Sequence, residues 1–360
     1  MPNTDPPGPL GDPAAADDPG GGRSGFPAAR FRAAASRLIP SPVFRRRVRS
    51  VFLAAVFPAL FSPAFQSCAT VSPVDGLPLA AAASPESAVP VWRPFPGTFA
   101  DGAVADGNGP GAFYCLAYFS GRVSRPRLEF HAVRLYLFSP SKRVAVGAGL
   151  AGAPDGETLS TRVSSFVRDK NLLAGINALP FDPVSGREGE PRTNVGLVIA
   201  DGAELSPAHP RFDALVFFAD GSAAVKPQTA AVSAENVENA VGGFFRILEN
   251  GKPVPRTAYL TARHPRSAAG ISPCGRFLYL LAIDGRRSGS VGATEAETAL
   301  LLRALGASEG INFDGGGSTA LAARFPDGTV RVLNTPVHGQ RRGRERAVAG
   351  SLGIGWRGPQ

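Results

Sequence analysis

The stretch that most restricts the fold spans residues 311–321, INFDGGGSTAL, where three consecutive glycines separate two apolar segments. Such a run costs backbone entropy on folding, so it is expected only where the backbone turns sharply or another group comes very close. The residues from Ala320 onward resume an apolar pattern typical of a strand. The run therefore predicts a strand, a glycine turn and a second strand, with Asp314 at the lip of the turn.

Two common glycine-rich sites are excluded at this run. A phosphate-binding loop needs a Lys after the glycines, or Gly-x-Gly-x-x-Gly opening a helix, and neither is present here. A serine nucleophile elbow needs Gly-x-Ser-x-Gly, which the residues around Ser318 lack. A tight turn and the floor of another kind of site remain as alternatives.

Composition allows a sizeable core, because 44% of the 360 residues are hydrophobic. The net charge of +9 is not concentrated on one stretch of the part expected to fold. We therefore expect a mixed, solvated surface and no nucleic-acid partner.

The N-terminal region has the layout of an export signal. Residues 1–42 are rich in Pro, Gly and Ala without an apolar period, so we expect them to be disordered or to reflect a wrongly assigned start. In residues 43–67, an arginine cluster precedes an apolar run at 51–65, and this predicts a signal peptide. The apolar run is shorter than the ~20 residues of a bilayer span.

Cys68 follows that signal at the processing point and resembles the lipidated cysteine of a bacterial lipoprotein. We expect a lipid anchor on Cys68 that holds the protein at a membrane surface in the cell envelope; simple secretion and a retained anchor are the alternatives. Residues 68–110 predict a flexible tether, and residues 111–357 predict one folded domain. Cys115 and Cys274 are left as a disulfide or as two separate thiols.

Short strands dominate the folded part. Residues 128–138 predict a strand with residues 143–150 as its partner, and Asp-Gly or Asn-Gly pairs at 201–202, 220–221 and 250–251 predict hairpin turns. One helix is well marked: Thr294 and Glu297 form a capping box, and Gly306 supplies the stop. The fold class expected is α+β, a single domain with a largely antiparallel or mixed β-sheet and few helices.

Several motifs in order resemble the phosphodiester glycosidase family across residues 128–356. They are GINALPF (175–181), HPRSAAGIS (264–272), the stretch from LLAIDGRR to INFDGGGSTAL (280–321) and ERAVAGSLGI (345–354). The sequence departs from the family where Leu179 and Pro180 replace a Gly-Phe pair and Ser267 replaces a Thr. The resemblance implies hydrolysis of a sugar-1-phosphodiester at the anomeric carbon.

That chemistry asks for a carboxylate near the sugar, where positive charge develops, and for cationic or backbone donors near the departing phosphate. The resemblance and the residue types make four residues the catalytic candidates: Asp314, Asp284, Arg266 and His264. Arg266 is the expected phosphate ligand, because a guanidinium matches two oxygens at once. For each of the four, a purely structural role is the alternative.

The same motifs supply the groups expected to bind substrate, which are side-chain amides, a guanidinium, backbone N–H groups and hydroxyls. The residues are Asn177, Asn194, Arg286, Gly315, Gly316, Gly317, Ser318 and Thr319. Glu345 and Arg346 are expected to brace each other or the site. We expect the reaction to require no cofactor. The alternative is a divalent cation held by oxygen ligands such as Asp284 and Asp314, whose identity the sequence does not indicate.

Two function classes follow. One is an exported hydrolase that cleaves sugar-1-phosphodiesters in envelope or extracellular glycoconjugates. The other is a lipid-tethered envelope protein that binds glycans without turnover. The sequence leaves the sugar, the stereochemical course and the oligomeric state open.

Overall fold

The computed structural model describes residues 79–80, 93–94, 103–104, 113–114, 116–138, 142–147, 157–184, 187–325 and 327–356. All of them belong to the unit Cys68–Gln360. The predicted disordered start, the signal peptide, Cys68 and Cys115 lie outside the described residues, and so does most of the tether. The predicted domain boundaries therefore stay predictions.

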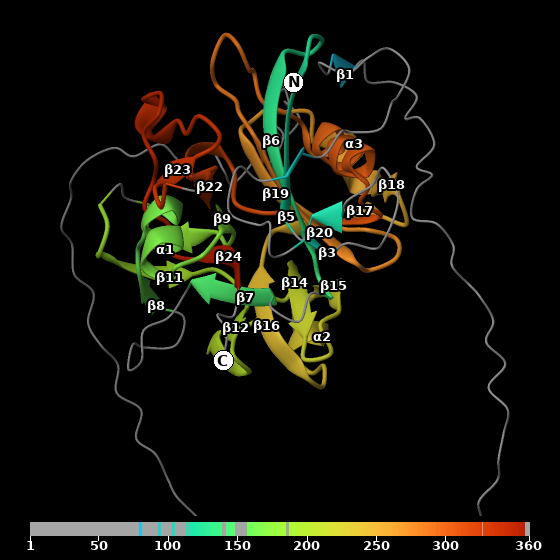
Figure 1. Cartoon of the computed structure of the whole chain (residues 1–360), viewed down its shortest axis with the longest axis vertical. Coiled ribbons are helices and arrows are strands. Elements are labelled where there is room, and N and C mark those ends of the chain that lie inside the picture. Colours follow the sequence, from blue (N-terminus) through green and yellow to red (C-terminus); the bar gives the residue numbers. More distant parts are fainter. Residues whose placement is uncertain are drawn as a thin grey trace, which may run out of the picture. The chain divides into compact units, whose positions relative to one another are not determined.

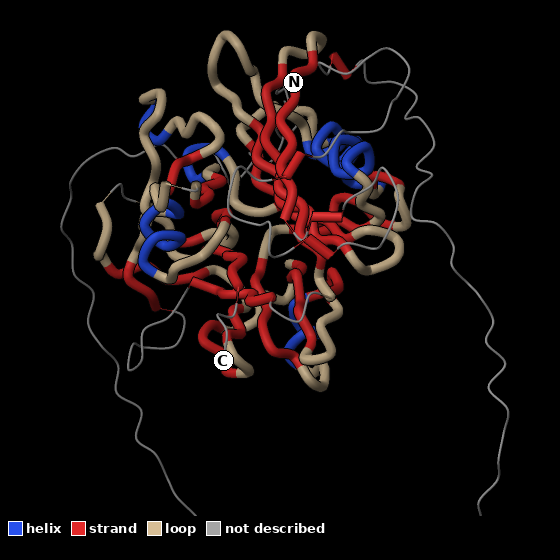
Figure 2. Tube along the Cα trace, viewed as in Figure 1, coloured by secondary structure: helices blue, strands red, loops and turns tan. Residues whose placement is uncertain are grey.

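Antiparallel sheets make up most of the described chain, as Figure 2 shows by the predominance of strands over helices. The largest sheet has nine strands in the order β1-β5-β6-β20-β19-β21-β17-β18, with β2 also pairing with β5. Its strands are β1 (Leu79–Ala80), β2 (Arg93–Pro94), β5 (Leu116–Val123), β6 (Leu128–Tyr136), β17 (Phe245–Glu249), β18 (Lys252–Pro253), β19 (Arg266–Ile271), β20 (Phe277–Ile283) and β21 (Glu309–Asn312). The expected α+β, sheet-rich class is confirmed.

Two five-stranded sheets accompany it (Figure 1). The first runs β23-β22-β9-β24-β7, with β7 (Lys142–Gly147), β9 (Ala174–Asn177), β22 (Leu321–Arg324), β23 (Val330–Val332) and β24 (Ser351–Trp356). The second runs β13-β12-β16-β14-β15, with β12 (Val198–Ala200), β13 (Ala203–Ser206), β14 (Asp213–Phe218), β15 (Ala223–Pro227) and β16 (Val237–Gly242). Smaller sheets join β8 (Glu157–Leu159), β10 (Phe181–Asp182) and β11 (Pro191–Asn194), and β3 (Ala103–Val104) with β4 (Phe113–Tyr114).

Helices are few and short. They are α1 (Val163–Asp169), α2 (Gln228–Val232) and α3 (Glu295–Leu305), with the 3₁₀ turns η3 (Pro255–Tyr259), η4 (Gly316–Ser318) and η5 (His338–Gln340). α3 has the predicted capping box at Thr294 and ends at Gly306 in the left-handed conformation. None of the described helices is both long and apolar enough to cross a membrane.

Strand β20 shows where the core lies, because every one of its residues is buried. Leu278, Leu280 and Ala282 belong to one hydrophobic cluster, while Tyr279 and Leu281 belong to another. Successive side chains of a strand point to opposite faces, so the nine-stranded sheet is covered on both sides here. α3 covers one face through Leu301, Leu302 and Leu305, and Figure 1 shows it beside β17–β20.

The short-range turn predictions are confirmed, but one strand pairing is wrong. The Asp201-Gly202 and Asn250-Gly251 turns have positive φ at both residues and join β12 to β13 and β17 to β18. The predicted pairing of 128–138 with 143–150 does not form. β6 instead lies between β5 and β20, and β7 pairs with β24 in another sheet. β6 is a central strand that places apolar residues on both faces, and the distant strand β20 supplies its second neighbour.

The glycine run joins two sheets. β21 leads into it from the nine-stranded sheet, and β22 leaves it in the five-stranded sheet next to β9. The predicted strand, turn and strand are present, but the two strands do not form a hairpin with each other. Asp314 and the three glycines therefore lie at a junction between sheets.

Candidate active site

Asn177, at the end of β9, clamps the glycine turn at both ends. Its Nδ2 donates to the backbone carbonyl of Asp314 at 2.6 Å, and its Oδ1 accepts from the Ala320 N–H at 3.1 Å. The Ser267 hydroxyl, on β19, donates to the same Oδ1 at 2.6 Å. Asn177 was predicted to bind sugar, but it is fully buried and uses these bonds to hold the turn between the two sheets. Ser267, which replaces a Thr of the family pattern, keeps the hydroxyl group that makes this contact.

Backbone contacts fix the turn further. The Asp314 N–H donates to the Ala178 carbonyl at 2.8 Å, and the Gly316 N–H donates to the Pro265 carbonyl at 2.9 Å. A Cβ on Gly315 would come within 2.7 Å of that same Pro265 oxygen, so a larger residue would push the two segments apart. The glycines thus allow the backbone of the His264–Arg266 motif to lie directly against the turn.

Two arginines pack against the other two glycines. A Cβ on Gly317 would lie 2.5 Å from Nη2 of Arg346, and one on Gly316 would lie 3.2 Å from Nη2 of Arg286. Gly316 also has a φ of +60°, which favours glycine. The missing side chains therefore make room for two guanidinium groups at the turn.

Arg286 itself has a φ of +55°, which is uncommon for a residue with a long side chain. It is exposed, and within the described part of the chain its guanidinium has no hydrogen bond or ion pair. Strained backbone at a charged, open side chain is a feature that clusters at ligand sites. Arg286 was predicted as a substrate-binding residue, and it is placed at the turn with its donors open.

Asp314 is the carboxylate at this turn, and it is half-buried. Burial raises its pKa to about 6, while a hydrogen bond from the Ser318 hydroxyl, the charge of Arg346 and the Gly315 N–H oppose the rise. Arg346 reaches the same hydroxyl, since its Nη1 donates to Ser318 Oγ at 3.2 Å. Ser318 thus links the cation to the carboxylate, which is ionised at neutral pH and protonated in mild acid.

His338, in η5, holds Arg346 through a hydrogen bond of its own. The Nε of Arg346 donates to His338 Nδ1 at 3.0 Å, so Nδ1 carries a lone pair and the imidazole is neutral with its proton on Nε2. Burial and the charges of Arg346 and Arg344 lower the pKa of His338 to about 4. At neutral pH this histidine can donate a hydrogen bond through Nε2, but it is not a proton source.

The predicted phosphate ligand Arg266 has a different environment. It is 8% exposed, its Nε donates to the Ala293 carbonyl at 3.0 Å, and its Nη2 donates to the Ala262 carbonyl at 3.3 Å. Its Nη1 also lies 3.9 Å from a carboxylate oxygen of Glu295 at the start of α3. Arg266 therefore ties the loops around α3 together. His264 pairs through its backbone with Ala293 in the same region.

Asp284, the second predicted carboxylate, is also engaged. It is buried at the end of β20, and its Oδ1 accepts from the Thr335 N–H at 2.7 Å and from Asn334 Nδ2 at 3.4 Å. Its Oδ2 pairs with Arg287. Both oxygens hold the loops that border the glycine turn, so Asp284 acts on the site through its neighbours.

The remaining predicted side chains are buried inside the protein. Ser318 and Thr319 are each 1% exposed, and Asn194 on β11 is buried with its Oδ1 near Gly350. Leu179, one of the departures from the family pattern, is 1% exposed in the main hydrophobic cluster. Leu179 therefore contributes to the core and does not face a ligand.

Two residues of this arrangement, Arg346 and His338, were not predicted to bind substrate. Arg346 was expected only to brace Glu345 or the site, although it belongs to the ERAVAGSLGI motif, which was the available signal. Glu345 points elsewhere: it accepts from the N–H and the hydroxyl of Ser164 at the start of α1, at 3.0 and 2.6 Å. Nothing in the sequence pattern around His338 pointed to it.

A metal centre has no obvious ligands here. Among the described residues, no three His, Cys, Asp or Glu side chains are grouped closely enough to hold an ion. Cys274 is exposed in the β19–β20 turn, with its Sγ 3.3 Å from Ser272 Oγ. The expectation that no cofactor is required stays a prediction, as does the alternative of a divalent cation.

Solved structures with a similar fold include the catalytic domain of zebrafish N-acetylglucosamine-1-phosphodiester alpha-N-acetylglucosaminidase, auto-inhibited by its pro-peptide. It has a TM-score of 0.52 and 19% identity, covering 71% of this chain and 87% of that one. A hypothetical protein from Synechocystis has a TM-score of 0.49 and 16% identity, covering 67% and 62%. A candidate exported protein from Burkholderia pseudomallei has a TM-score of 0.48 and 16% identity, covering 64% and 74%.

No curated protein matches the sequence. The sequence profile described as phosphodiester glycosidase matches residues 170–355, more than half of the chain. The matched region includes the clamp residue Asn177, the glycine turn and both arginines that pack against it. The chain therefore belongs to the phosphodiester glycosidase family.

Proposed function

We propose that this protein is an exported hydrolase that cleaves sugar-1-phosphodiesters in envelope or extracellular glycoconjugates. The observation that carries the proposal is the grouping at the glycine turn of one carboxylate, Asp314, with two guanidiniums, Arg286 and Arg346. This combination suits a reaction in which positive charge develops on the sugar and negative charge develops on the phosphate.

The proposed reaction breaks the bond between the anomeric carbon and the phosphate oxygen. The bonding electrons leave with the phosphate oxygen, so the departing group is a phosphate monoester. Water adds to the anomeric carbon and gives one proton to the solvent. Asp314 faces the sugar as a carboxylate and stabilises its developing positive charge. Arg286 and Arg346 bind the departing phosphate, each as a planar donor of several N–H groups.

A phosphate leaving group removes the need for a strong acid near the bond. Glycosidases that release an alcohol use a second carboxyl group to protonate it. The second predicted carboxylate, Asp284, has both oxygens engaged, and His338 is neutral at pH 7. A site with one open carboxylate and two arginines matches an anionic leaving group better than an alcohol.

Export and lipid anchoring are proposed from the sequence of residues 43–68. Arginines, a short apolar run and Cys68 follow one another there as in a lipoprotein signal. Labelling with palmitate in the native host should mark the wild type and not Cys68→Ser. Equal labelling of both would remove the anchor from the proposal.

A panel of sugar-1-phosphodiesters, with release of free sugar as the measurement, tests the activity. Arg346→Lys keeps one charge but loses the planar fork, so its kcat/KM should fall about tenfold on a phosphodiester and much less on a neutral aryl glycoside. Absence of turnover across the panel, with tight binding of the same compounds, would favour the alternative of a lipid-tethered glycan-binding protein. An equal fall on both substrate types would remove Arg346 from phosphate binding.

A further inference from the structure

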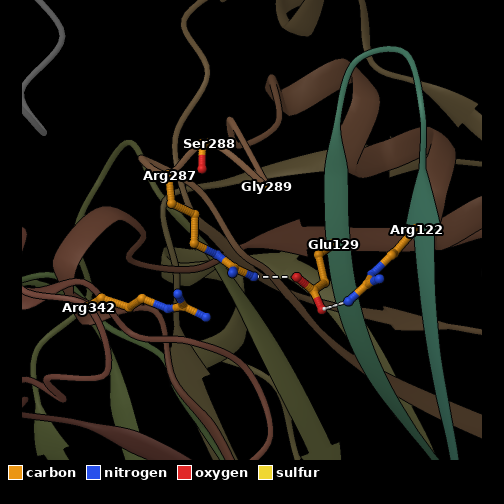
Figure 3. Close-up of a pocket in the computed structure, with 6 residues that line it drawn as sticks. All are labelled: Arg122, Glu129, Arg287, Ser288, Gly289 and Arg342. Atoms are coloured by element: carbon orange, nitrogen blue, oxygen red, sulfur yellow. Dashed lines mark hydrogen bonds and ion pairs between the residues drawn. The ribbon is translucent and has the colours of Figure 1, made fainter.

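The structure contains a pocket of about 350 Å³, which Figure 3 shows in close-up. Two segments and one hairpin form its walls: the turn side of β5 and β6, the loop from β20 to α3, and the segment 338–346, which we call the strap. The lining residues are Arg122, Glu129, Arg287, Ser288, Gly289 and Arg342.

The lining residues include three guanidiniums and one carboxylate, and the carboxylate is bound by two of the three. Glu129 accepts from Arg122 at 3.1 Å and also pairs with Arg287, which reaches Asp284 behind the pocket. Although burial alone would raise the pKa of Glu129, hydrogen bonds from these two arginines lower it. The negative charge of Glu129 is therefore balanced by these two arginines. The pocket therefore has an excess of positive charge.

Arg342 accounts for that excess. It is exposed, and in the part of the chain that the structure describes it has neither an ion pair nor a hydrogen bond. Figure 3 shows its side chain extending toward Arg287 within the pocket. Arg287 is already paired with Glu129 and Asp284, so Arg342 is the lining guanidinium whose positive charge an added anion would balance.

The strap supplies little negative charge of its own. Its one acidic residue, Glu345, is buried at the start of α1, where it accepts two hydrogen bonds from Ser164. Arg341, Arg342 and Arg344 are exposed along the same segment. A ligand that follows this surface meets arginines without competing carboxylates.

The same two segments border both the pocket and the glycine turn. In the β20–α3 loop, Arg286 packs against Gly316 and the next residue, Arg287, lines the pocket. In the strap, Arg346 packs against Gly317 and Arg342 lines the pocket. Four residues of extended chain span at most ~14 Å. The two groups of arginines are therefore within the reach of a short stretch of sugar-phosphate chain.

We propose that this pocket is a second anion subsite, which binds a further phosphate of the substrate while Arg286 and Arg346 hold the phosphate of the bond being cleaved. The substrate class is then a glycan in which phosphodiesters repeat along the chain, not a molecule with a single phosphate. This inference rests on the proposed function for the reaction, but the pocket itself is tested by binding alone.

The kinetic test compares two substrates with the same scissile bond, one carrying a single phosphodiester and one carrying two in succession. The wild type should have a KM about tenfold lower for the second substrate, as one charge-assisted contact provides. Arg342→Ala should abolish that preference. Arg341→Ala is the matched control: it removes the same charge from the strap outside the pocket, and the preference should remain.

Two results would overturn the subsite. One is an equal preference in wild type and Arg342→Ala. The other is an equal loss in Arg341→Ala and Arg342→Ala, which would assign the effect to the general charge of the surface.

Calorimetric titration with an oligomer of glycerol phosphate separates this inference from the proposed function, because the oligomer has no glycosidic bond to cleave. The wild type should bind it about tenfold more tightly than Arg342→Ala does, and added salt should reduce the difference. Such binding without turnover of any substrate would refute the proposed function and keep the subsite. Equal affinity of both proteins, or binding only to phosphatidylglycerol vesicles, would refute the subsite.

Discussion

Two regions of the molecule, the loops around α3 and the glycine turn, carry arginines that differ in what they contact. Around α3, Arg266 is bonded to the carbonyls of Ala262 and Ala293 and lies near Glu295. At the glycine turn, Arg346 contacts a hydroxyl and an imidazole nitrogen, and Arg286 has open donors. Arg266 is held by acceptors of the protein itself, whereas the turn presents cationic groups next to a carboxylate.

This contrast teaches that an arginine's motif does not fix its role. The His-Pro-Arg motif brings its backbone to the turn through the Pro265 carbonyl, while the Arg266 side chain contacts the loops around α3. Successive residues of a strand point to opposite faces, so Ser267 reaches Asn177 and Arg266 does not. The catalytic assignment of Arg266 stays a prediction, and the following variants test the two regions against each other.

The largest effect is expected from Asp314→Asn. The substitution keeps the size and most hydrogen bonds of the side chain but removes the charge that would stabilise the sugar. Turnover of a sugar-1-phosphodiester should fall about 10²–10³-fold, the usual cost of losing a positioned electrostatic group. Full activity of this variant on a good substrate would show that Asp314 has no catalytic role and that the glycine run is only a structural turn.

Arg266→Met and Arg286→Met should then separate the two regions by stability. Arg266→Met removes a side-chain donor from the carbonyls of Ala262 and Ala293, whereas Glu295 keeps its ion pair with Arg256. The free energy of unfolding should therefore fall by roughly 2 kcal/mol. Arg286→Met changes an exposed side chain and should leave stability within about 0.5 kcal/mol while weakening phosphodiester binding. Denaturant unfolding with KM measurements checks both. A stable Arg266→Met variant that has lost only substrate affinity would indicate that Arg266 binds the phosphate.

The local features of the fold were predictable from the sequence, and the contacts between distant segments were not. The capping box of α3 and the Asn250-Gly251 turn depend on residues a few positions apart, so short-range chemistry determines them. The pairing of β6 with β20, and the passage of the glycine run between two sheets, depend on partners far along the chain. The environment of Arg346 was hidden for the same reason, because Gly317 and His338 meet it only in the folded protein.

The free energy of unfolding should depend on pH because the Asp314 carboxylate is partly buried. Asp314 has a pKa raised from 3.8 to about 6, so the folded state holds its proton more tightly than the unfolded state does. Stability is therefore favoured below pH 4 and declines as the pH rises through 6, by about 3 kcal/mol from this group. Asp314→Asn should remove that decline and exceed the wild type in stability at pH 8. Parallel stability curves for the two proteins between pH 4 and 8 would contradict the raised pKa.

The smallest effect is expected at His338, which would act through Arg346 as a positioning residue. His338→Ala removes the acceptor of the Arg346 Nε–H and should lower kcat/KM on phosphodiesters about fivefold, the order of one lost hydrogen bond. His338→Gln supplies an amide oxygen in its place and should recover most of the loss. In an Arg346→Lys background, His338→Ala should add little, because two residues that act as one unit are not additive. An independent, full-size loss in that background would show that His338 contacts the substrate itself and belongs with the open donors of the turn.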